Sequence, residues 1–124
     1  MNFNTPIAEG NFQLTTTLVE EGQTTLSLDG HLSVYTRAWV TYTLRSESEA
    51  RVAGTLVGNG RTLNDEGVML ATEITGVWSR EKEIIHVIIH VIALDQVGNG
   101  DQSLTRYEVN ILTKEASVKV FNVD

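Results

Sequence analysis

The stretch Leu32–Leu44, which reads Leu-Ser-Val-Tyr-Thr-Arg-Ala-Trp-Val-Thr-Tyr-Thr-Leu, alternates between two kinds of side chain. Its even positions are mainly apolar, and its odd positions mix polar, charged and aromatic residues. A repeat of two residues is typical of a β-strand, because successive side chains point to opposite faces of a sheet. The stretch therefore predicts a strand with one buried face and one mixed face.

The rest of the chain has a composition that favours strands. It contains 14 Val, 8 Ile and 15 Thr among 124 residues, and these β-branched side chains suit a pleated surface better than a helix. Turn signals divide the chain into eight predicted strands: Phe12–Val19, Thr24–Leu28, Leu32–Leu44, Arg51–Val57, Val68–Arg80, Ile84–Leu94, Ser103–Leu112 and Ala116–Phe121. We expect a single all-β domain over residues 1–124, with residues 1–11 as an N-terminal arm.

The predicted connections between these strands are short. Asp29-Gly30 is typical of a type I′ hairpin turn, and Gly58–Gly60 is expected to lie in a loop. Short connections join neighbouring strands in an antiparallel meander. Eight such strands predict a small up-and-down β-barrel, which leaves no exposed sheet edge, and the alternative is a two-sheet β-sandwich.

The segment Ile84–Leu94, which reads Ile-Ile-His-Val-Ile-Ile-His-Val-Ile-Ala-Leu, is the most apolar in the chain. On a helix, His86 and His90 would be one turn apart and could share a metal ion. On a strand they lie about 13 Å apart, which is too far for one ion. The β-branched residues favour the strand, so we expect no metal site. Because both faces are apolar, we expect this strand to be central in the sheet and covered on each side.

The pairing of this segment with the next strand suggests a polar site. A hairpin symmetric about Asn99 places Val91 opposite Tyr107 and His90 opposite Glu108. A carboxylate facing an imidazole can act as an acid/base pair, so His90 and Glu108 are the candidate catalytic residues. The candidate ligand-binding residues that accompany them are His86, Arg106 and Glu73. This face could line a ligand-holding interior, be covered by a second copy of the chain, or be a partly exposed sheet surface.

A second candidate binding patch lies on the mixed face of the strand first described. Tyr35, Arg37 and Trp39 share that face, and aromatic rings beside a guanidinium can stack on a planar ligand. The alternative is an ordinary solvent face whose aromatic side chains shield neighbouring strands.

Composition excludes several classes of function. The chain has no cysteine, so disulfides, thiolate nucleophiles and cysteine-ligated metals are excluded. Its net charge of -7 argues against nucleic-acid binding. Phosphate-loop, dinucleotide, nucleophile-elbow and zinc-protease motifs are absent, so no cofactor is implied.

Met1–Gly10 lacks a secretory signal and Ile84–Leu94 is too short to cross a bilayer, so we expect a cytoplasmic protein without membrane contact.

The predicted shape resembles the small antiparallel barrels of lipocalin-like carriers and of cyclases of the allene oxide cyclase kind. The resemblance implies a barrel that binds a small apolar or amphipathic molecule, or a cofactor-free isomerase or cyclase, although a shared fold does not establish function. The alternative is a non-catalytic structural or interaction module that forms a homodimer through an apolar strand face.

Overall fold

The computed structural model describes residues 5–33, 36–46, 53–80, 88–97 and 102–122, with only the backbone described for Ser33, 88–97 and Asn122. These residues form eight strands and no helix, which confirms the all-β prediction. The strands are β1 (Ala8–Glu20), β2 (Gln23–Ser33), β3 (Thr36–Ser46), β4 (Ala53–Leu63), β5 (Met69–Arg80), β6 (Ile88–Val97), β7 (Gln102–Asn110) and β8 (Glu115–Asn122).

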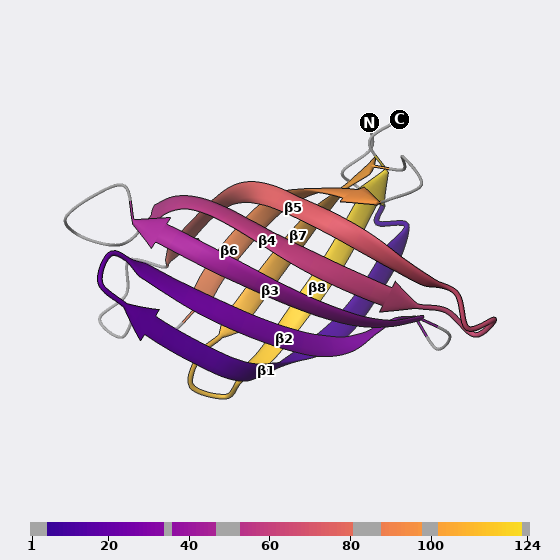
Figure 1. Ribbon diagram of the computed structural model, residues 1–124, viewed down its shortest axis with the longest axis horizontal. Helices are drawn as coiled ribbons and strands as arrows, with labels where there is room; N and C mark the ends of the chain where they lie inside the picture. The colour runs from indigo at the N-terminus through magenta and orange to yellow at the C-terminus, as the bar shows by residue number, and fades with distance from the viewer. Residues whose placement is uncertain (1–4, 34–35, 47–52, 81–87, 98–101, 123–124) are drawn as a thin grey trace.

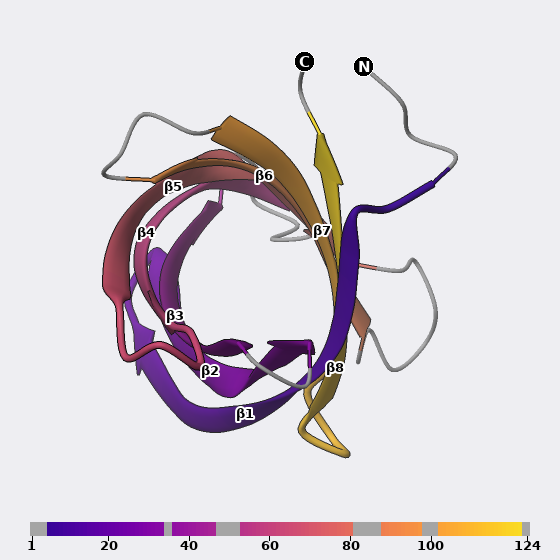
Figure 2. The ribbon, with the colours of Figure 1, turned by 90° about the vertical axis from the view of Figure 1, so that its right-hand side faces the viewer.

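The strands close into a barrel rather than a two-sheet sandwich (Figures 1 and 2). Each strand pairs antiparallel with the next along the chain, and β1 completes the ring by pairing with β8. The closing pairs run from Ala8 opposite Val120 to Gln13 opposite Glu115. Closure satisfies the backbone groups that two open edges would expose.

The closing pair corrects the predicted N-terminal arm. Residues 8–11 belong to β1, where Gly10 lies opposite Val118 and Asn11 lies opposite Ser117. This short segment contains polar residues and a glycine but no β-branched residue, so the sequence did not predict a strand there. The segment is a strand because it pairs with the edge of β8 that β7 does not cover.

Two predicted turns are wrong for a shared reason. Asp29 and Gly30 lie inside β2, and Gly58–Gly60 lies inside β4. The predicted strand Leu32–Leu44 was therefore wrong at its start, because β2 continues to Ser33 and β3 begins at Thr36. A Cβ atom on Gly30 would lie 2.4 Å from the carbonyl oxygen of Asn11, and one on Gly58 would lie 2.3 Å from that of Thr41. These glycines therefore permit close backbone approach within the barrel wall, which is a recognised use of glycine in strands.

The prediction that the isoleucine-rich segment forms a strand with a neighbour on each side is confirmed over its described part, whereas the expectation that both its faces are covered stays a prediction. Ile88–Val97 is a strand that pairs with β5 on one side and β7 on the other. Its register against β7 is the predicted one, with Val91 opposite Tyr107 and His90 opposite Glu108. Residues 84–87 of the predicted strand lie outside the described residues.

The interior of the barrel is filled by side chains. The ring of Tyr107 makes edge contacts with the rings of Phe12 and Tyr42, at centroid distances of 6.1 and 5.1 Å. These aromatic residues belong to one buried cluster with Leu14, Leu26, Leu28, Ala38, Val40, Leu44, Leu56, Ile74, Trp78, Val109, Ala116, Val118 and Val120. A barrel of eight strands is just wide enough to be filled in this way.

Candidate functional site

The structure places three of the predicted site residues, two ligand contacts and one catalytic residue, on the outer surface. The side chains of Glu73, Arg106 and Glu108 are exposed, whereas their strand neighbours Tyr107 and Ile74 are buried. Of the three alternatives left open for this face, a ligand-holding interior is excluded for these three side chains, because the alternate positions carry the core side chains. Glu108 lies opposite His90 as predicted, and the acid/base role of that pair stays a prediction. His86 and Tyr35 lie outside the described residues.

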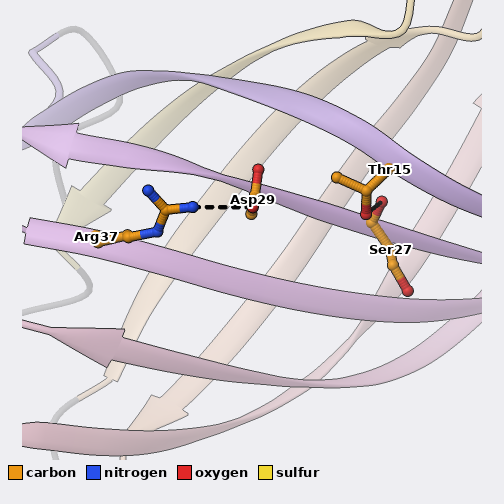
Figure 3. Close-up of polar contacts among 4 residues, drawn as sticks. All are labelled: Thr15, Ser27, Asp29 and Arg37. Carbon is orange, nitrogen blue, oxygen red and sulfur yellow. Dashed lines mark hydrogen bonds and ion pairs between the residues drawn. The ribbon is translucent and has the colours of Figure 1, made fainter.

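Arg37 and Trp39 come together on the outer face of β3, as predicted. The guanidinium of Arg37 lies 5.2 Å from the centroid of the Trp39 ring. Its Nη2 atom donates a hydrogen bond to Oδ2 of Asp29 on β2, 3.1 Å away (Figure 3). The guanidinium of Arg37 is therefore already engaged by an anionic and an aromatic side chain of the protein, which argues against a role in binding a ligand.

A broad open hollow lies beside this ion pair on the outer wall. Its volume is about 780 Å³, and it is lined by Asn11, Phe12, Gln13, Asp29, Gly30, His31, Arg37, Glu108, Asn110, Thr113, Glu115, Ala116 and Ser117. Most of these side chains are polar and exposed, and they carry charges of both signs. Such a lining is typical of a solvated surface, whereas small-molecule sites are mostly apolar.

A second hollow lies at one mouth of the barrel, the left-hand end in Figure 1, where β1, β3 and β5 end. Its volume is about 390 Å³, and it is lined by Thr17, Val19, Glu20, Gly22, Gln23, Thr24, Leu26, Leu44, Ser46, Trp78, Arg80 and Ile111. We call it the mouth pocket. Leu26, Leu44 and Trp78 are buried, and Ile111 packs against the same core cluster. The pocket therefore has an apolar floor that is continuous with the core.

A β-bulge in β1 brings that strand to the mouth pocket. The register against β2 shifts between Leu14 and Thr16, and the hydroxyl of Thr15 donates a hydrogen bond to the carbonyl oxygen of Ser27, 3.1 Å away (Figure 3). Beyond the shift, Thr17 lies opposite Leu26, which is a core residue. The extra residue of the bulge thus reverses which face of β1 each later side chain joins.

Arg80 forms the polar side of the mouth pocket and packs beside Trp78 of the floor. The indole Nε1 of Trp78 donates a hydrogen bond to the carbonyl oxygen of Arg45, 3.0 Å away. The guanidinium of Arg80 lies 5.7 Å from the centroid of the Trp78 ring. The Nε atom of Arg80 is buried and has no hydrogen-bond partner, and no ion pair joins Arg80 to another described residue.

The sequence reading missed Arg80, although a signal was present. Ile74 and Trp78 occupy even positions of β5 and are buried, so the same alternation brings Arg80 to the inner face. A charged residue at an inward-facing position near the end of a strand indicates a polar opening of the barrel, and this pattern could have identified Arg80 as a candidate site residue.

Within the part of the chain that is described, no group of three His, Asp or Glu side chains could hold a metal ion. The same residues include no helix long and apolar enough to cross a membrane. A comparison with known proteins found no matching family model, no matching curated protein and no matching solved structure.

Proposed function

We propose that this protein binds a small apolar or amphipathic molecule in the mouth pocket. The observation that carries the proposal is the concave apolar floor of Leu26, Leu44, Trp78 and Ile111 at an open end of the barrel. Ligand sites are commonly concave and mostly apolar, with volumes of about 300–1,000 Å³. At about 390 Å³, the pocket suits a medium-length alkyl chain or a small ring system.

The packed interior supports a ligand at the mouth rather than deep in the barrel. Tyr42 and Tyr107 occupy the middle of the barrel and are almost completely buried. An isomerase or cyclase activity through His90 and Glu108 stays a prediction from the sequence, as does a cytoplasmic location. Glu108 does not line the mouth pocket, so the proposal is one of binding and not of catalysis.

Tryptophan fluorescence tests the proposal directly, because the two tryptophans of the chain lie in different places. Trp39 is on the outer face of β3, and Trp78 forms part of the pocket floor. In a Trp39→Phe variant, Trp78 is the sole reporter. Titration with decanol should change its emission saturably, and an emission that does not respond would contradict the proposal.

A pair of matched variants locates the binding. Thr24 lines the pocket, and Thr75 is exposed on the outer face of β5. In the Trp39→Phe background, Thr24→Phe should fill the pocket and weaken decanol binding at least tenfold. Thr75→Phe adds the same bulk outside and should leave binding unchanged, so an equal loss in both variants would place the ligand elsewhere.

A second candidate function is self-association, which the exposed side chains of Val57 and Val77 favour. They lie on neighbouring strands, β4 and β5, and are 49% and 53% exposed. In register, Val77 also lies opposite Ile92 of β6. A homodimer through this face should give twice the chain mass by light scattering and become monomeric on Val77→Glu, and a monomeric parent protein rejects it.

A further inference from the structure

We propose that the molecule bound in the mouth pocket is an amphipathic anion, whose carboxylate or similar head group pairs with Arg80. This inference rests on the proposed function and adds the chemical class of the ligand. It follows from the state of the Arg80 side chain, which lines the pocket but forms no ion pair with any of the described residues.

Arg80 carries a hydrogen-bond donor that is withdrawn from water and left without an acceptor. Its Nε atom is buried and has no hydrogen-bond partner. Leaving a buried donor unsatisfied is costly, and the cost is greater when the group is charged. An acceptor that enters with the ligand would remove that cost, so the site favours a ligand that brings one.

The contacts that Arg80 makes with the described residues do not neutralise its charge. The ring of Trp78, at a centroid distance of 5.7 Å, attracts a cation through its π face but accepts no conventional hydrogen bond from Nε in this structure. Trp78 is itself oriented by its hydrogen bond to the carbonyl oxygen of Arg45. The aromatic contact therefore positions the guanidinium and leaves its donors for another group.

Glu20 is the one carboxylate among the described residues that line the pocket, and it has a different role. Its Oε1 accepts a hydrogen bond from Nε2 of Gln23, 3.2 Å away, across the β1–β2 turn. Both side chains are at the solvent-facing rim, and no ion pair joins Glu20 to Arg80. Among the lining residues that the structure describes, Arg80 is also the one cation, so it defines the positive end of the pocket.

The apolar floor and the guanidinium together specify a ligand with two unlike ends. The floor of Leu44, Trp78 and Ile111 suits an alkyl or ring portion, which contributes free energy by leaving water. A guanidinium binds a carboxylate through a planar fork of parallel N–H donors, which is stronger and more directional than binding a neutral hydroxyl. A medium-chain carboxylate meets both requirements.

Three probes of equal chain length test the head-group preference in the wild-type protein. Decanoate, decanol and decyltrimethylammonium are titrated at concentrations below micelle formation and followed by calorimetry. Decanoate should bind at least tenfold more tightly than decanol, and the cation most weakly. If decanol binds and decanoate binds no better, the anion inference fails while the proposed function stands. If none of the three binds, both fail.

Variants assign the preference to Arg80. Arg80→Gln should remove the advantage of decanoate and leave the affinity for decanol within about twofold. Arg61→Gln, on an exposed residue of the outer wall, makes the same change in net charge and should retain the full preference. Arg80→Lys keeps the positive charge but lacks the planar fork of N–H donors, so it should retain only part of the preference for decanoate over decanol. If Arg80→Gln does not fold, Arg80→Lys is used in its place. An undiminished preference in an Arg80 variant overturns the assignment.

Discussion

The indole nitrogen of Trp78 on β5 reaches across β4 and donates a hydrogen bond to the carbonyl oxygen of Arg45 on β3, 3.0 Å away. The intervening residue is Gly54, which lies opposite Trp78 in β4. A Cβ atom at Gly54 would lie 1.7 Å from the Arg45 oxygen and 2.9 Å from the indole nitrogen. The absence of a side chain at one position thus allows the pocket floor to be tied to a strand two places away.

Gly54→Ala should destabilise the protein strongly, because the clashing atom belongs to the backbone and cannot rotate away. We expect a loss of about 3 kcal/mol in the free energy of unfolding, measured with urea. Gly60→Ala is the matched control on the same face of β4, since its Cβ would lie 3.1 Å from a methyl group of Val40. That variant should lose only about 1 kcal/mol, and equal losses would contradict the argument.

Tyr107→Ala and Glu108→Ala test which face of β7 is the inner one. Tyr107 is buried against two aromatic rings, so its truncation should lower the free energy of unfolding by about 3–5 kcal/mol. Glu108 is exposed, and its truncation should change stability by no more than about 0.5 kcal/mol. The reverse order in a denaturant titration would show that the faces are assigned wrongly.

Asp29→Asn should have a small effect despite the ion pair with Arg37. The two side chains are 30% and 44% exposed, and water screens such pairs. We expect a loss of up to about 0.5 kcal/mol that shrinks further in high salt. A loss of several kcal/mol by thermal or chemical denaturation would show that the outer hollow depends on this contact.

Lys114→Asn should stabilise the turn between β7 and β8. Lys114 has a φ of 66°, a left-handed conformation that asparagine tolerates better than lysine. We expect a gain of about 0.5 kcal/mol in the free energy of unfolding. Lys119→Asn, in the regular part of β8, should instead lower stability because asparagine is disfavoured in strands. A loss at Lys114 as large as at Lys119 would contradict the conformational argument.

Local alternation was sufficient to identify all eight strands and the register of β6 against β7. The period of two along Thr36–Leu44 and the symmetric placement of residues around Asn99 are properties of short stretches, which the sequence displays directly. The same period continues back to Leu32 and did not show that Leu32 and Ser33 belong to β2. Glycine was the main source of error. Gly30 and Gly58 resemble turn residues locally, but their role depends on how closely a neighbouring strand approaches.

At the candidate site too, features set by a single strand were predictable from the sequence, and contacts between distant strands were not. The sequence could indicate that Tyr107 and Glu108 point to opposite faces, since that follows from the pleat of one strand. The apolar residues on the same face as Tyr107 indicate that this face packs in a core, and Tyr107 and Val109 are buried. The sequence could not indicate what that core contains, because this depends on the closure of β1 against β8 and on the rings that Phe12 and Tyr42 bring from other strands.

Strand number, antiparallel order and hairpin register were thus readable from the amino-acid order, because each depends on residues close together in the chain. The filling of the barrel, the mouth pocket and the burial of the Arg80 Nε atom without a hydrogen-bond partner were decided by packing among strands far apart in sequence. A pattern of period two states that a strand has two faces, whereas only contacts across the closed barrel determine what each face meets.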